Sequence, residues 1–226
     1  MEKNYGAGRR SLERAIELSP FNATARLRYS WVLLRARQLD EAVREMRLAQ
    51  EYDPLSAVNN AALCGMLVFE RNYDEAISSC DRASEINPAT PTLAHSRANA
   101  YFFKGDKKKA ILELEAFTKD DPEHFPEIGT LGYFYAKAGN KDMALRTIET
   151  LDKAAKECPR LNNDMAVISY ALGRKAAAFE FLERSIDTGW LTNLTLFDPT
   201  FDEIKADPLF DELIRRKNFK DAPDKP

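Results

Sequence analysis

The chain has 226 residues and a formal net charge of −3, from 33 lysines and arginines against 36 aspartates and glutamates. Because this balance gives no general positive field, the composition does not favour binding to nucleic acid or to an anionic membrane surface. The longest apolar run, near residues 61–69, is far shorter than the ~20 residues of a membrane-spanning helix, so we expect a soluble protein without membrane insertion.

Prolines mark an internal repeat. They recur at Pro20, Pro54, Pro88 and Pro122, and each interval is 34 residues. A fixed period in this range is typical of a repeat array, in which each unit packs mainly on its neighbours and no single central core is needed.

Columns of small and apolar residues continue the same period and predict one helix in each unit. The first column is small throughout and reads Gly8, Ala42, Ala76, Ala110, Ala144 and Ala178. Four residues later comes an apolar column of Leu12, Met46, Cys80, Leu114, Ile148 and Leu182, and three residues further a column of Ala15, Ala49, Ala83, Phe117, Leu151 and Ser185. Offsets of four and then seven residues form the buried stripe of an amphipathic helix. We interpret it as the second helix of each unit, which in the first unit covers residues 4–19.

A preceding helix in each later unit has columns of its own. A column of small residues reads Ser30, Cys64, Ala98, Gly132 and Ala166, preceded by Tyr29, Leu63, Arg97, Leu131 and Met165 and completed by Leu33, Leu67, Tyr101, Tyr135 and Ser169. Small residues on both helices allow an axis separation toward the short end of the usual ~8–10 Å. Each unit is therefore predicted to be a pair of antiparallel helices joined by a short turn.

These columns resemble the tetratricopeptide repeat, with its small residue in the first helix, alanine in the second and closing proline. The resemblance covers about residues 1–190 and implies an all-α fold, a right-handed superhelix or α-solenoid of about five and a half units. The first unit has only its second helix, and the expected further units are 23–56, 57–90, 91–124, 125–158 and 159–190. The usual tryptophan column reads Arg26, Asn60 and Ala94, and Lys156 replaces the expected proline, so we expect a different bend at the fifth junction.

A nine-residue duplication after the last unit predicts a helical C-terminal cap over residues 191–217. Asp198-Pro199 and Asp207-Pro208 each join an N-cap aspartate to a proline at the first helical position. The apolar residues expected to cover the final unit, as terminal units require, are Phe201, Ile204, Phe210, Leu213 and Ile214. Residues 218–226 are expected to be a disordered tail.

The ending from Gly173 to Glu183 with its two Asp-Pro-x-Phe motifs, and the segments at Tyr52–Ser56 and Tyr73–Ile77, are similar to a more particular pattern. Such segments form the C-terminal repeat arrays of bacterial winged-helix transcription regulators, adenylyl cyclases and serine/threonine kinases. This resemblance implies a partner-binding or sensory arm, with Met1 expected to start a piece cut from a longer chain. The alternatives are a free-standing adaptor for protein-complex assembly, and an accessory domain of an enzyme whose catalytic domain is absent.

A partner is expected on the concave surface that the first helices line. The candidates include rigid aromatic side chains typical of binding anchors, and they suit an apolar or aromatic-anchored protein or peptide segment. They are Trp31, Leu34, Arg35, Val68, Phe69, His95, Asn99, Phe102, Phe103, Tyr133 and Lys137. For each of them the alternative is packing between neighbouring helices. The family's basic groove for C-terminal carboxylates is not expected, because Pro126 and Thr130 occupy two matching positions.

The sequence predicts no catalytic, cofactor or metal site. The two histidines, His95 and His124, fall in different units, and no serine or cysteine has a context that would activate it. Cys64, Cys80 and Cys158 show no metal-ligand spacing and no disulfide framework. Cys64 and Cys80 are expected to be buried free thiols, with a redox pair as the alternative. A reducing, cytoplasmic setting follows, or the periplasm if the parent is a membrane-tethered regulator.

Overall fold

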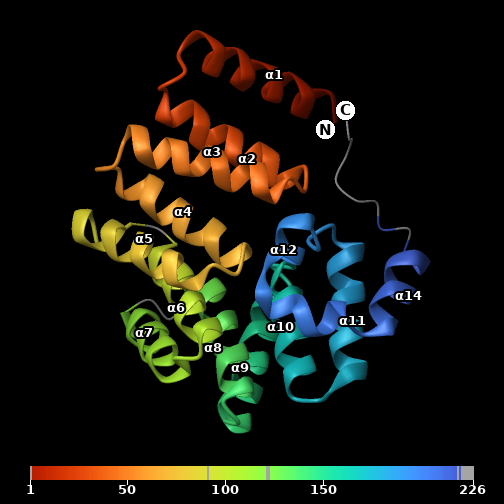
Figure 1. Cartoon of the computed structure of the whole chain (residues 1–226). Helices are drawn as coiled ribbons and strands as arrows, with labels where there is room; N and C mark the ends of the chain where they lie inside the picture. Colours follow the sequence, from red (N-terminus) through yellow and green to blue (C-terminus); the bar gives the residue numbers. More distant parts are fainter. Residues whose placement is uncertain (1, 91, 121–122, 218, 220–226) are drawn as a thin grey trace. The chain divides into compact units, whose positions relative to one another are not determined.

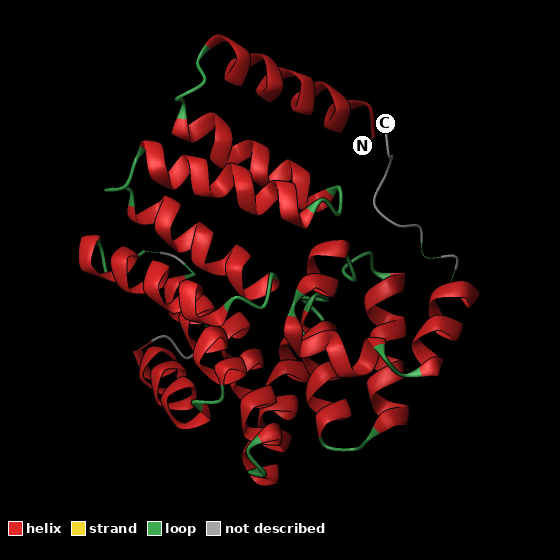
Figure 2. Cartoon of the chain, in the orientation of Figure 1, coloured by secondary structure: helices red, strands yellow, loops and turns green. Residues whose placement is uncertain are grey.

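The computed structural model describes residues 2–90, 92–120, 123–217 and 219. Two compact units divide the chain, one within residues 1–100 and one within residues 101–220, and the boundary lies inside helix α6. Every regular element of the described residues is helical (Figure 2). None of these helices combines the length and the hydropathy that crossing a bilayer requires.

The first unit consists of helix pairs (Figure 1). Its helices are α1 (Glu2–Leu18), α2 (Ala23–Arg35), α3 (Leu39–Tyr52), α4 (Ala57–Phe69), α5 (Tyr73–Ile86) and the beginning of α6 (Leu93–Lys104). Helix α2 pairs with α3 and α4 with α5, while α1 packs on α2 and α3 packs on α4. Side-chain oxygens of Asn22 and Ser56 accept hydrogen bonds from backbone N–H groups at the starts of α2 and α4. The first helices of two pairs therefore begin where polar caps satisfy free backbone donors.

The second unit continues the pairing and ends in shorter helices. It holds the end of α6, then α7 (Lys107–Asp120), α8 (Phe125–Lys137), α9 (Lys141–Ala154), α10 (Leu161–Ala171), α11 (Lys175–Asp187), α12 (Asn193–Phe197), the 3-10 helix η1 (Pro199–Phe201), α13 (Asp202–Lys205) and α14 (Pro208–Arg216). Helix α8 pairs with α9 and α10 with α11, α10 packs on α8, and α14 packs on α11. The all-α fold of antiparallel helix pairs with a helical cap is thus confirmed.

The small residues lie at the closest contacts between helices. The five alanines of the first column, Ala42, Ala76, Ala110, Ala144 and Ala178, are fully buried. A Cβ on Gly132 of α8 would come 2.5 Å from Cγ2 of Thr147 on α9. Gly8, at the same register position in α1, is exposed, because α1 has no first helix of its own to pack against. The small residues at these positions therefore allow the backbones of two paired helices to come close together.

The turn inside each helix pair has a left-handed residue that the sequence patterns did not reveal. The residues with positive φ in these turns again stand 34 apart, and they are Arg37, Arg71, Gly105, Gly139 and Gly173. In each turn the next N–H donates to a carbonyl five residues back, as from Gln38 to Leu33 at 3.0 Å. This is the Schellman helix ending, which favours glycine. Because arginine occupies two of the five positions, composition alone did not mark the column.

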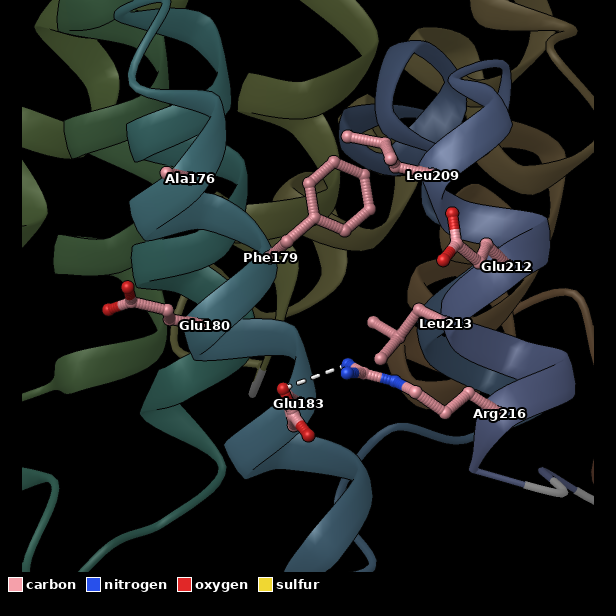
Figure 3. A pocket seen from close by; sticks show the side chains of 8 residues that line it. All are labelled: Ala176, Phe179, Glu180, Glu183, Leu209, Glu212, Leu213 and Arg216. Carbon is pink, nitrogen blue, oxygen red and sulfur yellow. Dashed lines mark hydrogen bonds and ion pairs between the residues drawn. The ribbon is translucent and has the colours of Figure 1, made fainter.

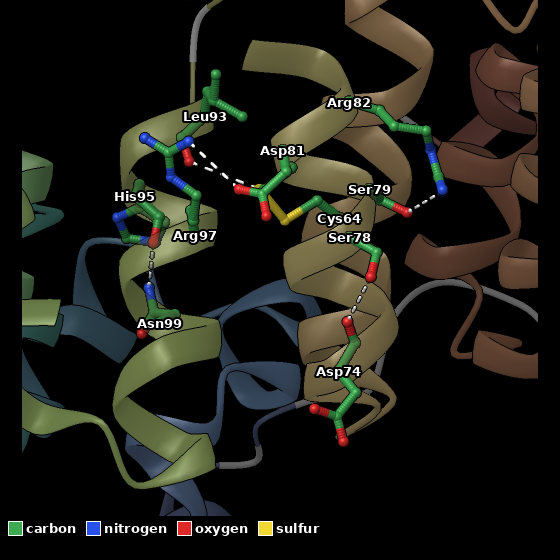
Figure 4. The surroundings of a disulfide bond; sticks show 11 residues. Cys64, Asp74, Ser78, Ser79, Asp81, Arg82, Leu93, His95, Arg97 and Asn99 are labelled. Carbon is green, nitrogen blue, oxygen red and sulfur yellow. Dashed lines mark hydrogen bonds and ion pairs between the residues drawn. A yellow bond between two sulfur atoms is a disulfide. The ribbon is translucent and has the colours of Figure 1, made fainter. Parts of the chain in front are cut away.

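Cys64 of α4 and Cys80 of α5 form a disulfide, so the prediction of two free thiols was wrong (Figure 4). Their Cα atoms are 5.4 Å apart, and both side chains are fully buried. The physical reason lies in the repeat register. Cys64 stands in the small column of the first helix and Cys80 in the apolar column of the second, and these two columns face each other across the helix pair. The free thiol is Cys158, which is half-buried.

The cap follows its predicted N-cap chemistry. Asp198 accepts a hydrogen bond from the N–H of Thr200 at 2.9 Å, and Asp207 accepts one from that of Leu209 at 3.1 Å. Four of the five expected cap residues are buried and Ile214 is half-buried. Helix α12 was not foreseen; its start is fixed by a capping box between Thr192 and Thr195. The predicted disordered tail lies outside the described residues, except for Phe219.

Candidate partner-binding surfaces

In the first unit, α2, α4 and the beginning of α6 carry seven of the predicted contact residues, and three of these are buried. Leu34, Val68 and Asn99 have almost no exposed surface. Nδ2 of Asn99 donates a hydrogen bond to the carbonyl oxygen of His95 at 3.0 Å, and its Oδ1 has no partner among the described residues. These side chains therefore contribute to packing in this structure.

The other four candidates of the first unit reach solvent. Trp31 is 38% exposed, and Arg35 lies exposed one helical turn further along α2. Phe69 at the end of α4 and His95 near the start of α6 are half-buried. Tryptophan and arginine are the residue types most enriched among side chains that dominate binding energies. The end of α2 is therefore the accessible part of this predicted surface.

In the second unit, the predicted aromatic residues pack on one another. Phe102 lies parallel to Phe134, with ring centroids 3.9 Å apart, and Phe103 stacks on Tyr133 at 6.3 Å. Phe102, Tyr133 and Phe134 are buried, whereas Phe103 is half-buried. Phe134 was not among the sequence candidates, although it follows Tyr133 directly. This cluster joins the end of α6 to α8, so packing accounts for most of its surface.

The cap contacts the remaining predicted residue of the second unit. Nζ of Lys137 lies 2.5 Å from a carboxylate oxygen of Glu203. Asp207 accepts hydrogen bonds from the Tyr170 hydroxyl at 2.9 Å and from Lys175 Nζ at 2.7 Å. The hydrogen bond from Lys175, followed by those from the Leu209 N–H and Tyr170, lowers the pKa of Asp207. The cap thus holds α8, α10 and α11 through charged groups as well as apolar packing.

An acidic side chain lies close to the backbone of α8. A Cβ on Gly129 would come 2.5 Å from the carboxyl carbon of Asp164 on α10. Burial raises the pKa of Asp164 to about 7; Arg160 opposes this shift, while Asp198 and Glu127 reinforce it. This carboxyl group therefore titrates near neutral pH.

A cleft between α11 and α14 was not foreseen (Figure 3). Its volume is about 200 Å³, and its lining comes from Ala176, Phe179, Glu180, Glu183, Leu209, Glu212, Leu213 and Arg216. Apolar side chains from both helices and four charged side chains line it. Sequence reasoning assigned Leu213 to the cap core and gave the other lining residues no role, since a cleft depends on how two distant helices pack.

The described residues hold no group of three histidine, cysteine, aspartate or glutamate side chains that could bind a metal ion. Nδ1 of His124 contacts the carboxylate of Glu127 within the start of α8.

Comparisons with known proteins agree with the repeat. Residues 3–57 match the family described as Tetratricopeptide repeat. A search of curated protein sequences found no match. Among solved structures, PilW, a widely conserved type IV pilus biogenesis factor, is similar with a TM-score of 0.63 and 20% identity, over 86% of this chain and 90% of that one. The structure of pilF of Pseudomonas aeruginosa is similar with a TM-score of 0.59 and 15% identity, over 86% of this chain and 89% of that one.

A third solved structure, a monomeric mutant of IFIT1 with Gppp-AAAA, has a TM-score of 0.63 and 17% identity, over 96% of this chain and 58% of that one. Similarity at these identities concerns the fold. Together with the match over residues 3–57, it confirms the predicted resemblance to tetratricopeptide repeats.

Proposed function

We propose that this array of tetratricopeptide-type helix pairs is a non-catalytic scaffold that binds a protein or peptide segment. The observation that carries the proposal is the pair Trp31 and Arg35, exposed one turn apart on the first helix α2 while neighbouring apolar residues of that helix are buried. A rigid aromatic side chain buries much area on binding, and tryptophan and arginine are both enriched among the side chains that dominate binding energies. The half-buried Phe69 and His95 are proposed as additional contacts in the same unit.

The chemistry of Trp31 favours an apolar or aromatic-anchored segment as the ligand. Burial of the remaining exposed part of a large side chain contributes roughly 1.5–3 kcal/mol, and association entropy offsets part of any such gain. Two or three contacts of this kind give a gross gain of roughly 3–9 kcal/mol, so after the association cost they support weak binding, with a Kd of roughly 0.1 mM or above. The fold alone does not choose the ligand class, because the IFIT1 structure contains Gppp-AAAA. We propose a protein ligand, because the net charge of −3 provides no positive field for a nucleic acid.

Two biological roles suit such a scaffold. The first is the partner-binding arm of a bacterial regulatory protein, supported by the resemblance of the C-terminal motifs to those arrays. The second is an adaptor for protein-complex assembly, supported by the fold similarity to PilW, a type IV pilus biogenesis factor. An accessory role for a separate catalytic domain is the remaining alternative. The native mass of the protein in its source cell separates the adaptor from the other two roles, because a protein with an attached effector or catalytic domain would be heavier than the 25.7 kDa of this chain.

The disulfide favours an oxidising compartment over the cytoplasmic one predicted from the cysteine count. Disulfides persist in the bacterial periplasm and outside cells, and are rare where thiols are kept reduced. Alkylation of the protein in unbroken cells, before any reduction, tests this placement. We expect Cys158 to react, whereas Cys64 and Cys80, which are fully buried and disulfide-bonded, should react only after both unfolding and reduction. Labelling of Cys64 and Cys80 in protein that is unfolded without a reductant would contradict the placement.

The binding proposal is tested by capture of partners from source-cell extract with the full chain. The double variant with Trp31→Ala and Arg35→Ala, called the α2 variant, should lose a partner that the wild type captures. Trp190→Ala is the matched control, because Trp190 is also exposed, at 46%, but follows α11 rather than lying on a first helix. A partner retained by the Trp190 variant and lost by the α2 variant supports the proposal. Equal capture by all three proteins would refute the assignment to α2.

A further inference from the structure

The cleft between α11 and α14 has an apolar floor supplied by both helices. Phe179 projects from α11 toward Leu209 and Leu213 of α14 (Figure 3). Leu213 is buried and Phe179 half-buried, whereas Leu209 is 47% exposed. The exposed leucine beside buried apolar groups therefore offers apolar surface that the side chain of a ligand could cover.

The charges around this floor are unbalanced. Arg216 of α14 lies 3.0 Å from one carboxylate oxygen of Glu183, and Lys217 lies 2.7 Å from the other. Lys217 also contacts Asp187 at 2.9 Å. The nearby cations are thus committed to acids of α11, and Arg216 presents no uncompensated charge to a ligand.

Two carboxylates of the lining remain without a cation. Glu180 on α11 and Glu212 on α14 are exposed, and no ion pair links either of them to another described residue. They stand on the two helices that form the walls. A ligand with positive charge at both ends of an apolar group would therefore match the cleft in shape and sign.

The volume limits the class of ligand. About 200 Å³ is less than the roughly 300–1,000 Å³ of pockets that enclose small molecules. It suits one or two side chains presented by a protein segment, with the charged neighbours of those side chains at the rim. A nucleic acid would be repelled by the uncompensated carboxylates.

We propose that the cleft between α11 and α14 binds a short protein segment in which a bulky apolar residue is flanked by lysine or arginine. Phe179, Leu209 and Leu213 contact the apolar residue, and Glu180 and Glu212 pair with the flanking cations. This site belongs to the second compact unit and uses none of the residues of α2, so it does not depend on the function proposed above. It gives the scaffold a second, electrostatically selective contact.

Fluorescence polarisation with three labelled hexapeptides and the full chain tests the proposal. The probes are Lys-Arg-Leu-Phe-Lys-Arg, its acidic counterpart Glu-Glu-Leu-Phe-Glu-Glu, and Lys-Arg-Ser-Ser-Lys-Arg, which lacks the apolar pair. We expect the first to bind with a Kd of roughly 10–100 μM, and the other two at least tenfold more weakly. Affinity for the first should fall as salt rises, because the paired charges are exposed.

Variants separate the two parts of the site. Glu180→Gln with Glu212→Gln should weaken the first peptide about fivefold and reduce its salt dependence. Leu209→Ser should weaken it about tenfold, and it leaves the fold in place because only the backbone N–H of Leu209 bonds to Asp207. Asp211→Asn is the control, since Asp211 is an exposed acid of α14 outside the lining. Circular dichroism checks that each variant is folded.

Three outcomes would overturn the proposal. The first is similar binding of the basic-apolar and acidic-apolar peptides, and the second is unchanged binding by the double glutamine variant. The third is self-association seen by light scattering and abolished by Leu209→Ser, which would make a second copy of this chain the occupant.

Discussion

The hydroxyl of Tyr170 on α10 donates a hydrogen bond to Oδ2 of Asp207, 2.9 Å away at the start of α14. The same oxygen accepts a bond from Lys175 at 2.7 Å, and the other oxygen of Asp207 accepts one from the backbone of α14. A single carboxylate thus both caps α14 and connects it to the last helix pair.

Asp207→Ala should therefore loosen the cap. The change removes the N-cap acceptor and the partner of two side chains, so we expect the melting temperature to fall by about 2–4 °C. Acid should have a similar effect on the wild type. Because the pKa of Asp207 is lowered in the fold, its contribution is present above the unfolded pKa of about 3.9 and is lost as pH falls through the folded value. Thermal melts between pH 2 and 7 check both; a variant with the wild-type profile would contradict this role.

Asp164 should make stability depend on pH in the opposite direction from Asp207. Its folded pKa of about 7 is raised above the ordinary value of 3.8, so the fold favours the protonated carboxyl. The resulting stability is present below about pH 4 and is lost as pH rises through about 7. Asp164→Asn keeps a neutral side chain of similar shape, and it should be more stable than the wild type at pH 8 by about 1–2 kcal/mol. Urea unfolding at pH 5 and pH 8 measures the difference, and equal gains at both values would rule out titration as the cause.

The helix pairs could be predicted from the sequence because burial is periodic. Ala42 and Ala76 stand 34 residues apart, and both are fully buried, so one pattern describes every unit. The left-handed turns were missed because Arg37 and Arg71 occupy positions where glycine would have been recognised. A left-handed turn can be recognised from the sequence only when its left-handed position holds glycine, the residue that favours this conformation.

The binding surface was harder to predict than the fold. A helix pattern places Trp31 and Leu34 on one helix, but their exposure depends on which neighbours cover them, and only Trp31 reaches solvent. The disulfide was partly visible, since Cys64 and Cys80 stand in facing columns, yet the same columns elsewhere hold ordinary packing residues such as Ser30 and Met46. The cleft beside α14 depends on contacts between segments more than 20 residues apart in sequence, for which the repeat provides no pattern.

The disulfide should stabilise the first unit. It links residues 16 apart, and closing a loop of about this length lowers the entropy of the unfolded chain by an amount equivalent to about 3 kcal/mol. Reduction of the wild type should lower the free energy of unfolding by about 2–4 kcal/mol, as measured by urea denaturation with and without dithiothreitol. Cys158→Ser should show the same loss on reduction, and Cys64→Ser with Cys80→Ser should show none. A reductant-insensitive wild type would contradict a disulfide in solution.

The left-handed turn after α2 offers a stabilising substitution. Arg37 has a φ of 63°, a conformation that costs a side-chain-bearing residue roughly 1 kcal/mol and glycine little. Arg37→Gly should therefore raise stability by up to about 1 kcal/mol, less any interaction that the arginine side chain makes. Gly139, with a φ of 86° in the equivalent turn after α8, supplies the reciprocal test: Gly139→Ala should lower stability by about 1 kcal/mol. Chemical denaturation of both variants checks the pair, and two changes of the same sign would refute the explanation.

Close approach within a helix pair predicts a large effect of added volume. Ala76 is fully buried on α5, which pairs with α4, so Ala76→Leu should overpack the contact and cost about 1–3 kcal/mol. Gly8, at the same register position of α1, has no atom within 4 Å of an added Cβ. Gly8→Ala should be neutral or stabilising, because alanine has a higher helix propensity than glycine. Melting curves of the two variants compare a buried position and an exposed position of the same repeat column. An unchanged melting curve for Ala76→Leu would show that the small residues do not set the helix separation.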